Sequence, residues 1–119
     1  MISSFHCDQN LLRVNPDLPG FGEFYMNTGK CQEQINSVKH TIRSLTGMMM
    51  PVDEGMAAIV DGASAIVEAC RIFIAIENYA NMHKTDEGIR FMYTNIEMQL
   101  PLLMDAFEKA RDDFKAACA

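Results

Sequence analysis

The sequence predicts an all-α fold, an elongated bundle of three long helices behind an irregular N-terminal arm. Three observations predict it: apolar residues recur at intervals of three and four, five glycines and prolines cluster within residues 16–29, and no segment has a convincing strand pattern. The 119 residues correspond to one domain. We divide it into an arm, residues 1–29, and a helical bundle, residues 30–119.

The arm contains the segment "RVNPDLPGFGEF", whose prolines and glycines favour irregular backbone. Phe21, Phe24 and Tyr25 are apolar enough to hold the arm against the bundle. We therefore expect the arm to be packed on the helices.

The first helix is predicted from Lys30 to about Thr46. Its apolar residues follow steps of 4, 3, 4 and 3, at Cys31, Ile35, Val38, Ile42 and Leu45. This narrow stripe on a polar helix is typical of a helix that buries one side. Gly47 is a suitable C-terminal stop.

The second helix is predicted from Pro51 to about His83, with a wide apolar face. The face comprises Met56, Ile59, Val60, Ala63, Ile66, Val67, Cys70, Phe73 and Ile74. The block "IFIAI", residues 72–76, is typical of the centre of a buried helix. A straight helix of this length measures about 48 Å, whereas a compact globule of this size is about 35 Å across. Either the helix breaks, for instance near Gly62, or the bundle is elongated and a second copy covers the wide face as a homodimer.

The third segment runs from about Thr85 to Ala117. Its stripe consists of Ile89, Met92, Ile96, Leu100, Leu103, Phe107, Ala110 and Phe114. Pro101 interrupts this stripe. A proline inside a helix kinks or breaks it, so we expect a kinked helix or two helices.

Charge and hydropathy exclude several classes of protein. The net charge of −6 argues against direct binding to nucleic acid and to an anionic membrane surface. No apolar run reaches the roughly 18 residues of a membrane span, and the N-terminus does not resemble a signal peptide. We expect a cytoplasmic protein whose four cysteines are mostly buried, reduced thiols.

Motifs for enzymatic chemistry are missing from the sequence. It contains no Glu-x-x-His pair for a di-iron bundle, no glycine-rich phosphate loop, no Gly-x-Ser-x-Gly elbow, and no zinc spacing among its cysteines. We therefore expect no metal, no cofactor and no enzymatic activity.

His40 is a candidate phosphoacceptor. At 100° per residue it points away from the stripe of the first helix, and Arg43 and Ser44 follow it by three and four residues on the same face. The segment His40-Thr41-Ile42-Arg43-Ser44 resembles the motif of histidine-phosphotransfer (HPt) domains, which are all-α and relay phosphoryl groups between receiver domains. The resemblance implies that His40 accepts the phosphoryl group, Arg43 stabilises it and Ser44 leaves room for the receiver. The alternative is an ordinary surface histidine.

Two further groups are candidate partner-binding residues. Met48, Met49 and Met50 lie between two helices, and methionine suits adaptable binding surfaces; the alternative is loose packing at the bundle end. The last helix carries an acidic row that could mimic phosphates, formed by Glu97, Asp105, Glu108 and Asp112. Nearby lysines and arginines could instead neutralise it.

The leading functional hypothesis is a small protein-binding module: an adaptor, chaperone or inhibitor that acts as a homodimer on an unidentified protein. A histidine-phosphotransfer protein is the second hypothesis. The third is an acidic inhibitor that occupies the basic groove of a nucleic-acid-binding enzyme.

Overall fold

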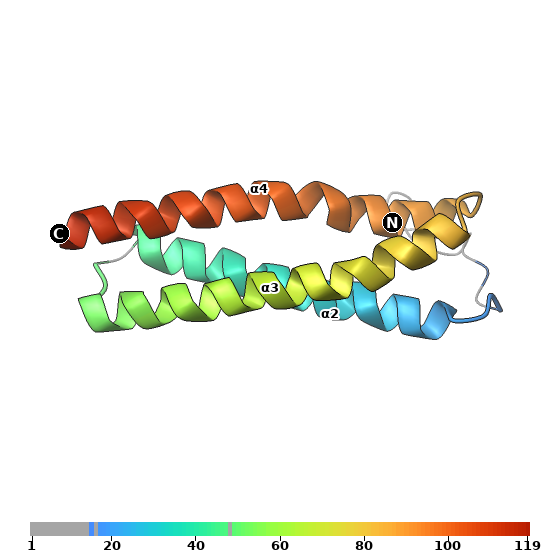
Figure 1. Ribbon diagram of the computed structural model, residues 1–119, viewed down its shortest axis with the longest axis horizontal. Helices are drawn as coiled ribbons and strands as arrows, with labels where there is room; N and C mark the ends of the chain where they lie inside the picture. Colours follow the sequence, from blue (N-terminus) through green and yellow to red (C-terminus); the bar gives the residue numbers. More distant parts are fainter. Residues whose placement is uncertain (1–14, 16, 48) are drawn as a thin grey trace, which may run out of the picture.

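The computed structural model describes residues 15, 17–47 and 49–119, and this part of the chain contains three helices and no strand. They are α2 (Phe21–Gly47), α3 (Val52–Met82) and α4 (Glu87–Cys118). Figure 1 shows α3 running antiparallel to both α2 and α4 in an up-down-up bundle. The predicted all-α bundle is confirmed.

The bundle is long and thin, with extents of 54 × 33 × 18 Å and a radius of gyration of 17.2 Å. A compact domain of this length has a radius of gyration of roughly 13.5 Å. The helix α3 continues through Gly62 without interruption. Of the two possibilities for the second helix, elongation is confirmed and the break is wrong.

The first described helix begins at Phe21 rather than at Lys30, so residues 21–29 are helical and not irregular. Phe24 is fully buried, and its ring stacks on Tyr79 of α3 with 4.8 Å between the ring centroids. This long-range packing lets the helix start earlier in the chain than the apolar stripe that begins at Cys31.

Tyr79 also fixes the turn that leads into α2. Its hydroxyl donates a hydrogen bond of 2.9 Å to the carbonyl of Pro19. The next residue, Gly20, has φ of +81°, a value that glycine adopts without steric cost.

The predicted stripes of α2 and α4 are confirmed. In α2 the predicted residues are buried, except that Ile42 is half-buried. In α4 every predicted stripe residue is buried. Each of these helices has a single apolar side, so only that side can face the core.

The helix α4 is one continuous element, so of the two alternatives predicted at Pro101 the split into two helices is wrong, and the kink stays a prediction. Pro101 is exposed. Proline has no backbone N–H, so one hydrogen bond of the helix is missing there, and the hydrogen bonds of the neighbouring turns keep the helix continuous. The helix starts at a side-chain cap, because Asp86 accepts a hydrogen bond of 3.0 Å from the backbone N–H of Ile89.

The buried side of α3 differs from the predicted one. The helix buries Gly55, Ile59, Gly62, Ala65, Ala69, Ile72, Ile76 and Ala80. Most of the predicted face is exposed or half-buried, and only Ile59 of that face is fully buried. In the block "IFIAI", Ile72 and Ile76 are buried whereas Ile74 is exposed.

Two glycines explain this choice of side. The ring of Phe114 lies where a Cβ of Gly55 would be, and the ring of Phe107 lies where a Cβ of Gly62 would be. The bulky rings of α4 therefore pack against backbone, which requires the smallest residues of α3 to face the core.

Candidate interaction surfaces

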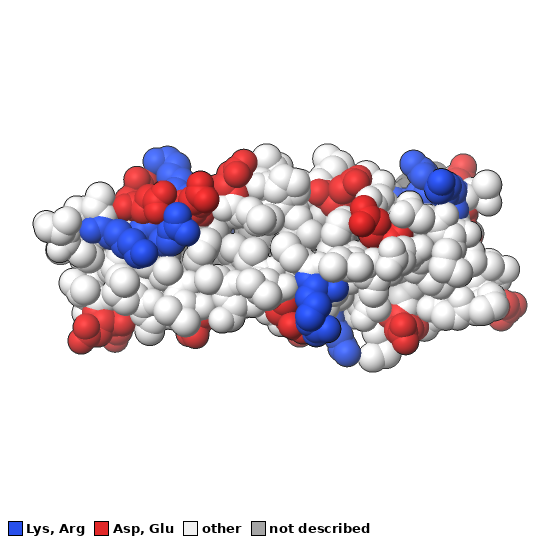
Figure 2. All heavy atoms as spheres, viewed as in Figure 1, with Lys and Arg blue, Asp and Glu red and all other residues white. Residues whose placement is uncertain are grey.

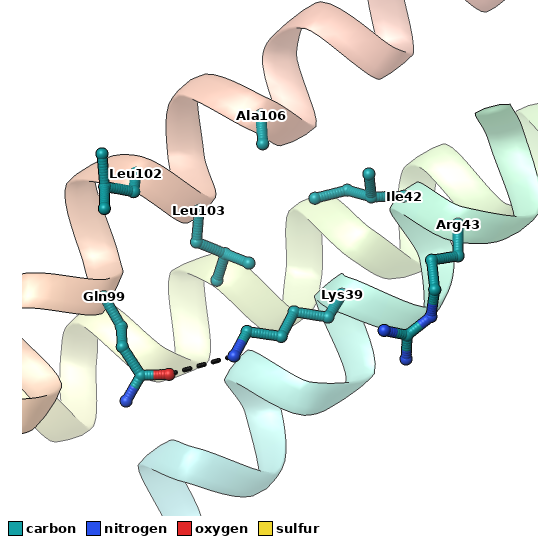
Figure 3. Close-up of a pocket in the computed structure, with 7 residues that line it drawn as sticks. All are labelled: Lys39, Ile42, Arg43, Gln99, Leu102, Leu103 and Ala106. Carbon is teal, nitrogen blue, oxygen red and sulfur yellow. Dashed lines mark hydrogen bonds between the residues drawn. The ribbon is translucent and has the colours of Figure 1, made fainter.

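The phosphoacceptor candidate His40 is exposed in the C-terminal third of α2, with Arg43 exposed and Ser44 half-buried. Arg43 lines the cleft between α2 and α4 (Figure 3), and His40 is not among the residues that line it. In the described part of the chain, no hydrogen bond or ion pair joins His40 to Arg43.

The cleft beside Arg43 was not predicted. It has a volume of about 390 Å³, and its apolar wall is formed by Ile42, Leu102, Leu103 and Ala106. In Figure 3 Lys39 reaches across to α4, where its amino group donates a hydrogen bond of 3.2 Å to the side-chain oxygen of Gln99.

Gln99 also exchanges hydrogen bonds with Gln32 of α2, at 2.8 and 3.2 Å. These polar contacts tie α2 to α4 across the cleft. Lys39 therefore has a structural role, and the cleft is an open groove rather than a closed site.

The methionine turn lies at one end of the bundle. Met48 is outside the described residues, Met49 is exposed, and Met50 is half-buried against the core. Met49 and Met50 line a depression of about 630 Å³ with residues of the last turns of α4. Of the two described methionines, Met50 therefore packs against the core and Met49 faces solvent.

The acidic residues of α4, namely Glu97, Asp105, Glu108 and Asp112, are all exposed. Basic side chains lie among them on the C-terminal half of α4 (Figure 2). Lys109 pairs with Asp113 and Arg111 with Asp112, both at 2.9 Å. This mixed charge favours an ordinary solvated surface over a row of phosphate-like charges.

An exposed apolar row lies on α3. Four large apolar residues on one side of this helix are exposed: Met56 at 40%, Val60 at 63%, Val67 at 67% and Ile74 at 59% of their full surface. Exposed Ala63 and half-buried Cys70 complete the row. We call Met56, Val60, Ala63, Val67, Cys70 and Ile74 the α3 strip.

The α3 strip borders α4 on the side of the bundle away from α2. Its Val60, Ala63 and Val67 form a groove of about 530 Å³ with Arg111 of α4. Figure 2 shows a largely uncharged band along α3, with acidic and basic side chains toward its edges. An apolar row with a charged rim is typical of a protein-binding surface.

Tyr93 fixes the other end of the α3–α4 contact. Its ring stacks on Phe73 with 5.6 Å between the centroids. Its hydroxyl lies 2.7 Å from a carboxylate oxygen of Glu97 and 3.2 Å from one of Glu77. These hydrogen bonds, the one to Glu97 first, and burial raise the pKa of Tyr93 well above its ordinary value.

The comparisons with known proteins do not identify a family for this chain. No family model, curated protein or solved structure matches the chain. Within the described residues, no three His, Cys, Asp or Glu side chains are placed to hold a metal ion, and no helix has the length and apolar character to cross a membrane.

The sequence contained a signal for the α3 strip. Its residues follow steps of 4, 3, 4, 3 and 4, the same periodicity as the buried stripes. Within the wide apolar face they could not be told apart from core residues, because periodicity does not tell whether a neighbour belongs to the same chain or to another one.

Proposed function

We propose that this chain is a small protein-binding module that docks an α-helical partner through the α3 strip. The observation that carries the proposal is the exposure of Met56, Val60, Val67 and Ile74 along one side of a rigid, continuous helix. Full burial of such a side chain contributes about 1.5–3 kcal/mol, and the part of it that corresponds to the exposed fraction is available to a partner.

The groove between helices suits an amphipathic helix. Such ligands insert apolar residues at intervals of three and four into a groove with a polar rim. The strip offers the matching periodicity, and Glu68 and Arg111 lie at the rim of its groove. We also propose a cytoplasmic location, which the free thiols of Cys31, Cys70 and Cys118 support.

A peptide selection tests this proposal. A library of amphipathic helical peptides is selected on the immobilised chain and then measured against Val60→Glu/Val67→Glu. We expect the affinity for the selected peptides to fall at least tenfold, because two charges would be placed under an apolar ligand.

The matched control is Asn36→Glu/Ser37→Glu, which adds the same charge at exposed positions of α2. It should keep wild-type affinity. Circular dichroism should show equal helix content in all three proteins. Selected peptides that bind the strip variant as tightly as the wild type would disprove the proposal.

A phosphotransfer function is the second candidate, favoured by the exposure of His40 and Arg43 on α2. It is tested by incubation with acetyl phosphate: the bond from phosphorus to the acetyl oxygen breaks, a bond to an imidazole nitrogen forms, and acetate leaves. We expect an acid-labile, alkali-stable phosphate that is absent from His40→Gln and present in the control His83→Gln. Equal labelling of both variants, or none of the wild type, would exclude His40 as acceptor.

A further inference from the structure

We propose that the partner on the α3 strip is a second copy of this chain, packed antiparallel across a two-fold axis level with Ala65 and Met104. This inference rests on the proposed function, because it names the occupant of the same surface. It gives that surface a register, which can be tested residue by residue.

The spacing of the strip is the first argument. The steps 4, 3, 4, 3 and 4 read the same in both directions, and their centre is Ala65. An antiparallel second copy therefore brings each strip residue opposite another strip residue, pairing Met56 with Ile74, Val60 with Cys70, and Ala63 with Val67.

Side-chain size distinguishes this arrangement from a parallel one. In the antiparallel register the small Ala63 faces Val67 and the small Cys70 faces Val60, so each small residue meets a larger one. In a parallel pair Ala63 would face Ala63 and leave a gap, which a well-packed interface avoids. Antiparallel helices also bring opposite ends of their dipoles together.

The helix α4 gives an independent argument from charge. Phe114 packs against Gly55 and Phe107 against Gly62. The two helices are antiparallel, so moving seven residues forward along α3 corresponds to moving seven residues back along α4. The level of Ala65 on α3 is therefore the level of Met104 on α4, and the two-fold axis that centres one helix pair centres the other.

On α4 this axis matches opposite charges. Glu97 and Arg111 lie two helical turns before and after Met104, on the same side of the helix. Within each copy Glu97 accepts the hydrogen bond of Tyr93, and Arg111 pairs with Asp112. In the dimer Glu97 of each copy additionally faces Arg111 of the second copy, so the pair occurs twice. Half-exposed Met104 lies at the centre between them.

The size of the surface fits a dimer. A helix of the length of α3 spans about 46 Å, and two helices side by side are about 20 Å wide. The α3–α4 face therefore covers on the order of 900 Å², close to the ~800 Å² that each partner contributes to a standard interface.

Cysteine crosslinking tests the register. In a Cys7→Ser/Cys118→Ser background, Val60→Cys places a thiol opposite Cys70 of the second copy. Mild oxidation should give a covalent dimer in which a disulfide joins the introduced thiol to Cys70, because facing residues have Cα atoms within about 7 Å. The same two positions within one chain are about 15 Å apart along the helix, too far for an internal disulfide.

Two controls make this result specific. Asp61→Cys in the same background, exposed on another side of α3, should give no covalent dimer. The background protein itself should also stay uncrosslinked, since the two Cys70 residues lie about 15 Å apart along the helices in this register, too far for a disulfide. A Cys70–Cys70 link would instead show a parallel pair and overturn the proposal.

Charge reversal tests the α4 contact. Without crosslinking, sedimentation equilibrium should give twice the chain mass of 13.4 kDa. Glu97→Arg or Arg111→Glu alone should weaken the dimer about tenfold, because like charges then face each other twice. The double reversal Glu97→Arg/Arg111→Glu should restore it, which a mere folding defect in either single variant would not do.

The outcomes separate this inference from the proposed function. A chain that remains a monomer but binds selected peptides at the strip keeps the proposed function and overturns the dimer. If Val60→Glu/Val67→Glu still forms a dimer and still binds the peptides normally, both the dimer inference and the proposed function are overturned. A dimer in which the thiol introduced by Val60→Cys forms no disulfide with Cys70 overturns the antiparallel register.

Discussion

At the scale of single residues, Cys31 shows how the core treats an ionisable group. Its side chain is fully buried, and its sulfur lies 3.4 Å from the carbonyl oxygen of Ala69, to which it donates a weak hydrogen bond. Burial, with a smaller contribution from Cys70, raises the pKa of the Cys31 thiol from 9.0 to about 11. The folded protein therefore holds this proton more tightly than the unfolded chain does.

This predicts a loss of stability in alkali. The contribution of the neutral thiol is complete below pH 9 and is lost as the pH rises toward 11, because only the unfolded chain releases the proton in that range. Urea unfolding at pH 8 and pH 10.5 should show a fall of about 2 kcal/mol from this group.

The matching variant is Cys31→Ala, which is less stable at pH 8 because it loses packing. It should show a smaller fall at pH 10.5, with a remainder from Tyr79 and Tyr93, whose pKa values are also raised. An equal fall in both proteins would mean that the buried thiol does not cause the alkaline instability.

At the scale of helices, the contact of α3 with α4 depends on residues without side chains. Gly55 and Gly62 are seven residues apart, as are Phe107 and Phe114, and the four meet as two glycine–ring pairs. In an isolated helix both glycines would be destabilising. They occur inside α3 because the rings of Phe107 and Phe114 occupy the space that a Cβ atom at these two positions would need.

Alanine substitution should therefore have opposite effects at different glycines. Gly55→Ala and Gly62→Ala should each destabilise the protein by about 1–3 kcal/mol, because the buried rings would have to shift. Gly29→Ala in α2 should stabilise it by about 0.5–1 kcal/mol, since nothing lies within 4 Å of the added methyl.

Chemical denaturation measures all three variants under the same conditions. Gly29→Ala gives the gain in helix propensity without a steric conflict, so the difference between it and the other two isolates the overlap with the rings. Stabilisation by Gly62→Ala would show that Phe107 can move freely, and steric fit would then no longer explain which side of α3 is buried.

At the scale of the whole molecule, the elongated shape follows from three long helices of similar length. The three described helices have 27, 31 and 32 residues, and none of them is broken. A thin three-helix bundle has a large surface relative to its volume, so it leaves more apolar side chains exposed than a compact domain does. The α3 strip is the main consequence, and a second copy would cover it.

The sequence predicted the fold class and two of the three helix faces. In α2 and α4 the apolar residues occupy one narrow side, so residues such as Ile35 and Ile96 have only one direction in which to be buried. His40 and the acidic residues of α4 stay predictions. The exposure of the α3 strip could not be predicted, because the wide apolar face of this helix left open which part of it the chain itself would cover.

The sequence by itself determined that the chain is helical, roughly where α3 and α4 lie, and that α3 carries a wide apolar face. Only the tertiary structure decided which side of α3 faces inward. Helical periodicity is equally good on both sides of this helix, and the choice depends on the steric fit of Phe107 and Phe114 to two glycines. The side left over, with Val60 and Val67 in water, is the surface from which we infer the function.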